Sequence, residues 1–302
     1  FKIMNELVDP VNELIRFKAD FAYDGTDFNG WAKQPGYRTV EGELLEALEV
    51  IFGECENSFG LTVAGRTDSG VHARHQVVHF DLNPTQIKRL GRFGSPGILE
   101  GSIRDRINSL VKNDIRVFSV VYAPEGFEAR FSAIYRRYRY RIADGLAVKD
   151  PVESRNTLWT RRPLDLLEMQ ATALSLYGLH DFAAFCKPRP FATTIRELRE
   201  VTIERRPDEN HVVVIELTAD AFCHNMVRSI VGALIAVGEG RATRQDVLQR
   251  LNSGNRKGAY KVVSSRGLTL LEIGYPEDSK LAEQANLARD HRKLADPDDL
   301  DD

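Results

Sequence analysis

The chain has few cysteines: three in 302 residues, at Cys55, Cys186 and Cys223. They are far apart, odd in number and form no C-x-x-C pair, so the sequence predicts neither a structural zinc site nor a disulfide framework. We therefore expect reduced thiols, as in a cytoplasmic protein. The chain also lacks any apolar run near the roughly 20 residues that a membrane-spanning helix needs. Its first ten residues lack a basic start followed by an apolar stretch, so we expect no secretory signal and no membrane partner.

Neither sign of charge is in large excess, since the formal net charge is −3. Acidic residues are concentrated in 277–302, which leaves the preceding part of the chain slightly basic. We expect this polar, acidic tail to be disordered. The overall composition, 42% hydrophobic and 28% charged, is typical of a globular protein, and the length allows one large domain or two ordinary ones.

The periodicity of apolar residues predicts both strands and helices. Strands are expected at 16–22, 61–64, 76–82, 115–121, 135–142, 197–204, 212–217 and 268–273. Helices are expected after an N-cap at Thr39, from Ser102 with Asp105 completing a capping box, and at 164–177, 222–237 and 247–251, with a surface loop at 85–101. This mixture predicts an α+β fold with antiparallel sheet, divided into two similar domains at 14–122 and 123–276.

A single carboxylate, Asp68, lies in the run A-G-R-T-D-S-G-V-H-A at residues 64–73. Gly65 and Gly70 allow a substrate to approach the backbone closely, or allow positive φ angles. Arg66 supplies a cation that can hold the carboxylate ionised at neutral pH. An ionised, desolvated carboxylate is a competent nucleophile. The alternative is a turn residue that hydrogen-bonds its own backbone, which is the commoner role of an isolated Asp-x-Gly segment.

The run at 65–73 resembles the active-site loop G-R-T-D-x-G-V-H-A of the TruA-type tRNA pseudouridine synthases, and Q-V-V-H-F at 76–80 also matches. The resemblance covers about residues 16–276. It departs at Ser69, where most members carry Ala, at Lys112, in a longer loop around 92–101 and in the acidic tail. The further matches, in family order, are Y-D-G-T-D-F-x-G-W at 23–31, A-R-F-S-A at 129–133, R-Y-R-Y at 137–140, H-D-F-x-x-F at 180–185, A-F-x-H-x-M-V-R at 221–228 and G-L-x-L at 267–270.

The resemblance implies an isomerase that converts uridine to pseudouridine at positions 38–40 of the tRNA anticodon arm, with no metal or organic cofactor. It gives the essential catalytic role to Asp68, which attacks either the sugar C1′ or the base C6. Arg228 lies on an otherwise apolar helix, where a buried charge needs a partner. The resemblance implies that this partner is Asp68, and the alternative is a structural salt bridge elsewhere. The family also implies two α+β domains whose antiparallel sheets join side by side, a basic cleft between them, and a homodimer that binds the tRNA.

Several substrate contacts are expected. Tyr138 matches the family's substrate-contacting tyrosine and would stack on an extruded uracil. The alternative is that it is simply an aromatic residue of the predicted strand. Arg130, Arg137 and Arg139 are interleaved with aromatic residues, which suits RNA phosphates. On a strand, however, Arg137 and Arg139 project to the face opposite Tyr138, so a solvated face is the competing interpretation. His72 and Leu270, within the matching motifs, complete the expected substrate-binding set.

Three histidines, His72, His75 and His79, suggest a metal site at first sight. On a strand His75 and His79 would lie about 13 Å apart, too far for one ion, and no helical H-x-x-x-H or cysteine pair adjoins them. A metal-dependent hydrolase that uses Asp68 and the histidines is therefore a weak rival hypothesis. A chelator would inhibit such a hydrolase but not a cofactor-free isomerase.

The main rival is a non-catalytic RNA-binding protein with the same fold. Such a protein would have no need for a nucleophile, so the presence of Asp68 together with Arg66, Tyr138 and Arg228 favours an enzyme.

Overall fold

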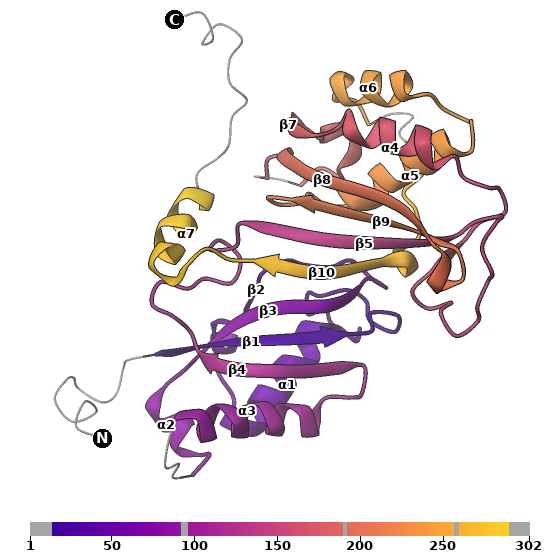
Figure 1. The fold of residues 1–302 in the computed structure, drawn as a ribbon. Coiled ribbons are helices and arrows are strands. Elements are labelled where there is room, and N and C mark those ends of the chain that lie inside the picture. Colours follow the sequence, from indigo (N-terminus) through magenta and orange to yellow (C-terminus); the bar gives the residue numbers. More distant parts are fainter. Residues whose placement is uncertain (1–13, 92–95, 190–191, 257–259, 290–302) are drawn as a thin grey trace, which may run out of the picture.

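The computed structural model describes residues 14–91, 96–189, 192–256 and 260–289. In this part of the chain one 10-stranded sheet has the main order β4-β1-β3-β10-β5-β9-β8-β7, with β2 paired to β3 and β6 paired to β5. Helices α1 to α3 lie beside the first strands of this order and α4 to α6 beside the last (Figure 1). The predicted mixture of helices with a mostly antiparallel sheet is therefore confirmed.

The strands are β1 (Ile15–Tyr23), β2 (Thr62–Val63), β3 (His72–Leu82), β4 (Ile115–Tyr122), β5 (Tyr135–Ala143), β6 (Leu158–Trp159), β7 (Gly178–Asp181), β8 (Ile195–Arg206), β9 (Val212–Ala219) and β10 (Leu268–Gly274). The α-helices are α1 (Val40–Phe52), α2 (Pro84–Lys88), α3 (Pro96–Leu110), α4 (Leu166–Leu174), α5 (Met226–Gly238), α6 (Arg244–Ser253) and α7 (Leu281–Arg289).

The centre of the sheet is made by β10, which comes from the end of the chain. It pairs in parallel with β3, with Thr269 opposite His72 and Leu270 opposite Ala73, and antiparallel with β5. The strands of the first half of the chain therefore continue into those of the second half without a break. Two antiparallel sheets were expected to join side by side. In the structure the two strands at this junction, β3 and β10, run parallel to each other.

The core follows from the period-two pattern of strands such as β1. Phe17 and Phe21 are fully buried, and each such side chain contributes about 1.5–3 kcal/mol relative to leaving it in water. Helix α1 begins after Thr39, whose Oγ1 accepts a hydrogen bond from the Gly42 N–H at 3.2 Å, as predicted. The apolar stripe of α1 is buried and consists of Val40, Leu44, Leu45, Leu48 and Phe52.

The expected loop at 85–101 is wrong, because helical structure occupies most of it. Helix α2 begins with a capping box between Asn83 and Gln86, and α3 begins at Pro96. Ser102 and Asp105 therefore lie inside α3 rather than at its start, and Asp105 pairs with the neighbouring Arg104 at 2.8 Å. Residues 92–95 of the expected loop lie outside the described residues.

The expected disorder of the acidic tail is also wrong for its first part, which forms α7. Leu281 and Ala285, one helical turn apart, are buried. The Ser132 hydroxyl donates to the carbonyl of Leu281 at 3.1 Å, and the Arg289 guanidinium lies 5.2 Å from the ring centre of Phe131. Two apolar side chains at helical spacing therefore dock this helix on the body of the protein. The remainder of the predicted tail, 290–302, lies outside the described residues.

Two of the three cysteines are joined, which corrects the expectation of reduced thiols throughout. Cys186 and Cys223 form a disulfide, whereas Cys55 is free. The two residues are 37 apart in the sequence, yet their Cα atoms are 5.7 Å apart. The spacing that excluded a C-x-x-C pair carried no information about this tertiary contact.

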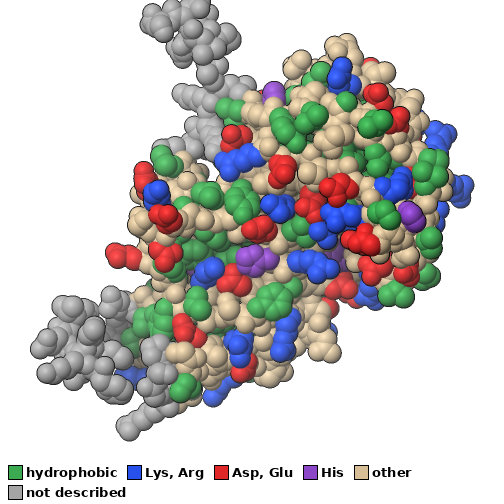
Figure 2. Space-filling model, in the orientation of Figure 1, with side chains coloured by type: hydrophobic (Ala, Val, Ile, Leu, Met, Phe, Trp, Pro, Cys, Tyr) green, Lys and Arg blue, Asp and Glu red, His purple; other side chains and the backbone are tan. Residues whose placement is uncertain are grey.

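The surface carries charges of both signs. Figure 2 shows acidic and basic side chains interspersed on the side seen in Figure 1, with no large area of one sign in that view. In the described ranges, no helix combines the length and the apolar character that crossing a membrane requires.

Candidate active site

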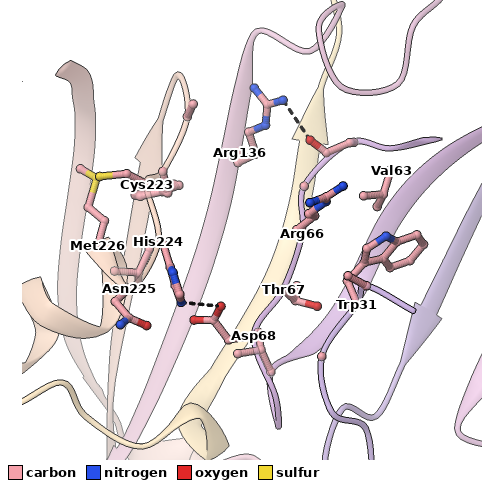
Figure 3. Close-up of a pocket in the computed structure, with 18 of the residues that line it drawn as sticks. Trp31, Val63, Arg66, Thr67, Asp68, Arg136, Cys223, His224, Asn225 and Met226 are labelled. Carbon is pink, nitrogen blue, oxygen red and sulfur yellow. Dashed lines mark hydrogen bonds and ion pairs between the residues drawn. The ribbon is translucent and has the colours of Figure 1, made fainter. Parts of the chain in front are cut away.

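A pocket of about 1040 Å³ is lined by residues of the first turns of α1 and α5, of β5 and of the Asp68 loop. Its walls include Glu41 in the first turn of α1 and Arg228 in the first turn of α5, and its floor includes Arg136 and Tyr138 of β5. The loop that carries Asp68 forms one side, as Figure 3 shows. The pocket therefore draws residues from both halves of the chain.

The Asp68 loop is fixed by backbone hydrogen bonds to the turn that follows β1. The N–H of Trp31 donates to the carbonyl of Thr67 at 3.0 Å, and the N–H of Gly70 donates to the carbonyl of Phe28 at 3.2 Å. The Thr67 hydroxyl also lies 2.8 Å from the buried hydroxyl of Tyr23. These contacts hold the loop on both sides of Asp68. They therefore fix the position of its backbone and the direction in which its side chain leaves the loop.

Two glycines make this docking possible. Gly70 has a φ of +77°, in the left-handed region, and a Cβ there would lie 2.6 Å from the hydroxyl oxygen of Ser265. A Cβ at Gly25 would collide with the backbone carbonyl of Val71. Of the two glycines predicted for this role, Gly70 has the positive φ, whereas a Cβ at Gly65 would meet only the Tyr138 hydroxyl at an ordinary 3.9 Å.

The carboxylate of Asp68 faces two basic side chains from the second half of the chain. Its Oδ1 lies 3.3 Å from Nε2 of His224, and its Oδ2 lies 3.5 Å from Nη1 of Arg228 (Figure 3 shows the first pair). The Asp68 side chain is 29% exposed, so the pair is partly shielded and a substrate can still reach it. The predicted pairing of Asp68 with Arg228 is present in the structure.

His224 was not among the predicted site residues. The sequence predicted a helix from residue 222, but α5 begins at Met226, after Asn225 with a φ of +69°. This positive φ separates the direction of residues 222–224 from that of the helix, and His224 reaches Asp68 from that loop. A usable signal was present, because on the predicted helix His224 lies one turn before Arg228 and shares its face.

Arg66 does not take the role expected for it. Its side chain is exposed and lines the pocket, but among the described residues it forms no ion pair with Asp68. Arg130 also lines the pocket, with its guanidinium 4.9 Å from the ring centre of Phe131. Both are therefore cations at the mouth of the site rather than partners of the carboxylate.

Tyr138 lies at the floor of the pocket and is 7% exposed. The ring of Phe222 packs edge-on against it, at 5.2 Å between ring centres. Burial raises the pKa of the Tyr138 hydroxyl well above its usual value, so the phenol stays protonated at neutral pH. Leu270 is directly opposite Tyr138 in the β5–β10 register and is completely buried, so it supports the floor without lining the pocket.

The other arginines of β5 divide between the two faces of the sheet. Arg137 lies 3.8 Å from Glu272, and Arg139 lies 2.7 Å from Glu216, on the face opposite Tyr138. The structure therefore does not bring Arg137 or Arg139 to the pocket with Asp68.

Arg136, which was not predicted as a site residue, faces the pocket with Tyr138. Its guanidinium donates to the carbonyls of Ala64, Asp220 and Arg130 at 3.1, 2.8 and 2.6 Å. Burial lowers the pKa of Arg136 from its usual value. In the sequence Arg136 belongs to the basic run of residues 130–141. Only the pairing of β5 with its neighbouring strands shows that it lies on the pocket face of the sheet.

His72 has a structural set of contacts. Its Nδ1 accepts from the N–H of Gly25 at 3.1 Å, and its Nε2 lies 2.9 Å from the carbonyl of Arg155 and 3.1 Å from that of Arg266. The ring is buried beneath these loops and stands behind the Asp68 loop rather than at the pocket. In the described part of the chain, no group of three or more His, Cys, Asp or Glu side chains is arranged to hold a metal ion.

Comparison with known proteins gives the same family over most of the chain. A family model described as tRNA pseudouridine synthase matches residues 172–276. The tRNA pseudouridine synthase A of Leifsonia xyli is 45% identical over 288 residues, covering 94% of this chain and 99% of the relative. That of Streptomyces avermitilis is 45% identical over 296 residues, covering 96% and 98%. That of Frankia casuarinae is 46% identical over 276 residues, covering 91% and 95%.

Proposed function

Because the chain belongs to the tRNA pseudouridine synthase A family, we propose that it converts uridine to pseudouridine in tRNA, at positions 38–40 of the anticodon stem-loop. The single observation that carries this proposal is the pairing of Asp68 with Arg228 and His224 in a pocket that also contains Tyr138. The pocket is large enough for a nucleotide that has left its stack, which the reaction requires because C1′ and C6 are inaccessible in a helix.

Asp68 acts as the nucleophile in this proposal. Its attack falls on C1′ of the ribose or on C6 of the uracil, and the N1–C1′ bond then breaks. The base turns and C5 forms the new bond to C1′, which displaces the Asp68 carboxylate if it was bound to C1′; if it was bound to C6, the carboxylate leaves as the Asp68–C6 bond breaks. The hydrogen on C5 is lost as a proton while N1 gains one. Atoms and electrons balance without a cofactor. Arg228 holds the carboxylate by their ion pair, and the partial burial of the site limits access of water to the detached base.

Tyr138 provides the surface on which the extruded uracil stacks. Its ring is held from the side by Phe222, so little side-chain entropy is lost when the base binds. The hydroxyl is uncharged at neutral pH and can serve as a donor or an acceptor beside the base.

The RNA backbone binds to the cations around the pocket. Arginines contact phosphates through their forked N–H groups, and several line this pocket together with the carboxylates of Asp68, Glu41 and Glu128. Those proposed to bind RNA are Arg66, Arg130, Arg189 and Arg196, whereas the partly buried Arg136 holds backbone carbonyls. Arg137 and Arg139 are paired with glutamates on the other face of the sheet, so any contact that they make with the RNA lies outside the pocket.

Three further features belong to the proposal. The residues 14–122 and 123–276 act as two domains that share the sheet, and tRNA as substrate places the enzyme in the cytoplasm. The active form is a homodimer. Support for a second copy comes from β4, an edge strand of the sheet on which Phe118, Val121 and Tyr122 expose apolar surface. Light scattering at several protein concentrations measures the mass directly.

The decisive experiment is to incubate the protein with an unmodified tRNA transcript, with and without a chelator, and to map pseudouridine by chemical probing. Pseudouridine at positions 38–40 in both arms is the expected result. Binding of the transcript without conversion would instead identify a non-catalytic RNA-binding protein, and activity that the chelator abolishes would identify a metal-dependent reaction.

A further inference from the structure

His224 is fixed in place by its neighbours along the chain. Its backbone carbonyl accepts a hydrogen bond from the N–H of Lys187 at 2.8 Å. The preceding residue, Cys223, is tied to Cys186, and the following residue, Asn225, has the φ of +69° that turns the chain into α5. The imidazole therefore projects toward Asp68 from a constrained backbone, as Figure 3 shows.

The surroundings of the two ring nitrogens indicate one tautomer. Nε2 faces Oδ1 of Asp68 at 3.3 Å, where two lone pairs would repel each other, so the proton belongs on Nε2. Nδ1 is buried and has no hydrogen-bond partner among the residues that the structure describes. A second proton on Nδ1 would therefore place an N–H in the interior without an acceptor, which is costly.

The charges around His224 also favour the neutral ring. Burial is the main cause that lowers the pKa of His224, and the cations Arg189, Lys187 and Arg256 lower it further, whereas Asp68 opposes them. Arg228 adds another cation on the far side of the carboxylate. Neutral imidazole with its proton on Nε2 is thus the form expected at pH 7.

We propose that His224 is a positioning residue for the reaction, whose Nε2–H holds one oxygen of Asp68 while Arg228 holds the other. This inference rests on the proposed function. Two donors on two oxygens fix the rotation of the carboxylate and keep its attacking lone pair directed into the pocket. A neutral donor does this without the extra stabilisation of the anion that a second cation would bring, which would make the carboxylate a weaker nucleophile. Catalytic hydrogen bonds are often longer in the free enzyme than in the substrate complex, so we expect this contact of 3.3 Å to shorten when substrate binds.

The test compares His224→Phe with His224→Gln in single-turnover assays on the tRNA transcript. Phenylalanine keeps the ring but removes the donor, whereas the glutamine amide reaches the position of Nε2. We expect His224→Phe to slow the chemical step at least about tenfold with tRNA affinity within about twofold, and His224→Gln to recover most of that loss. His75→Phe is the matched control, because His75 also contacts an aspartate, Asp20 at 2.8 Å, but outside the pocket.

A spectroscopic measurement tests the tautomer without relying on turnover. In ¹⁵N-histidine protein, the imidazole signals missing from His224→Gln should report a neutral Nε2–H ring from pH 8 to pH 6. An imidazolium at pH 7, an Nδ1–H ring, or glutamine no better than phenylalanine would overturn the inference. An active wild-type protein with unchanged His224→Phe rates overturns this inference alone, whereas a wild-type protein that forms no pseudouridine overturns the proposed function.

Discussion

The guanidinium of Arg228 lies 3.5 Å from the carboxylate of Asp68 through Nη1, while its Nε donates to the backbone carbonyl of Val263 at 2.7 Å. The carbonyl of Val263 thus fixes the plane of the Arg228 guanidinium, which presents a charged N–H to Asp68. Because the two groups come from different halves of the chain, the alignment depends on how β3 and β10 join the sheet.

Replacing Asp68 with asparagine should abolish pseudouridine formation. The amide has nearly the same shape, so the loop contacts of Thr67 and Gly70 remain, but the nucleophilic charge is lost. We expect tRNA affinity within a few-fold of wild type, measured by filter binding beside the activity assay. Appreciable turnover by Asp68→Asn would show that another group attacks the substrate.

Arg228→Lys should slow the reaction about 100-fold although it keeps the charge, since a lysine cannot contact Val263 and Asp68 with one planar group. Single-turnover rates at saturating tRNA measure the effect. Arg199→Lys is the matched control, because Arg199 also bridges a carboxylate and a backbone carbonyl, those of Glu197 and Ile134, on the surface. Equal rates for the two variants would remove the positioning role of Arg228.

Tyr138→Ala should lose the stacking surface, at a cost of about 1–3 kcal/mol in transition-state binding, or roughly 5- to 150-fold in rate. Tyr138→Phe should retain most of it. Since burial keeps the Tyr138 phenol protonated, the pH dependence of the rate between pH 6 and 9 should be the same for Tyr138→Phe and wild type. A rise or fall of the wild-type rate with pH that is absent from Tyr138→Phe would show that the Tyr138 hydroxyl titrates in this range. Melting temperatures of both variants check that the floor of the pocket is intact.

The buried His79 should make stability depend on pH. Burial, together with the charge of the nearby Arg16, lowers the pKa of His79 to about 4, while its Nδ1 accepts a hydrogen bond from the N–H of Ala129 at 3.0 Å. The unfolded chain, with an ordinary histidine pKa near 6.5, binds the proton first. The stabilisation is therefore complete above about pH 6.5 and declines as the pH falls toward 4, by at most about 1.4 kcal/mol per pH unit.

Urea unfolding at pH 7.5 and 5 measures this effect. The variant His79→Asn keeps an acceptor near the position of Nδ1 but cannot gain the proton, so its loss of stability between the two pH values should be smaller than that of wild type. Equal losses would show that other groups cause the dependence.

Truncating the contact of α7 should destabilise the protein. Leu281 is 1% exposed and anchors the helix, so Leu281→Ala should cost about 2–4 kcal/mol in the free energy of unfolding. On the same helix Leu287 is 61% exposed, and Leu287→Ala should change stability by less than about 0.5 kcal/mol. If Leu281→Ala unfolds at the same denaturant concentration as wild type, the helix does not stabilise the fold.

Much of the local structure could be predicted from single segments. The N-cap at Thr39 and the strand at Tyr135–Ala143 depend on neighbours within a few residues, and those interactions are visible in the sequence. The clearest failures are at three helices. Helix α2, capped by Asn83, lies in the segment predicted as a loop, and the capping pattern at Ser102 placed the start of α3 about two turns too late. Helix α7 was missed because its short apolar pair, Leu281 and Ala285, was outweighed by the acidic composition.

The sequence by itself determined the chemical groups of the site: a carboxylate between glycines, an arginine on an apolar segment and a tyrosine in a basic strand. The family resemblance indicated Arg228 as a partner of the carboxylate, but the residues alone could not determine the full set of side chains that meet it. Arg66 is two residues from Asp68 but projects to the pocket mouth, whereas His224 and Arg228 reach Asp68 from the other half of the chain. Only the parallel pairing of β3 with β10 and the positive φ of Asn225 decided this, because ion pairs form between side chains that the folded backbone aims at each other, and proximity along the chain does not fix that direction.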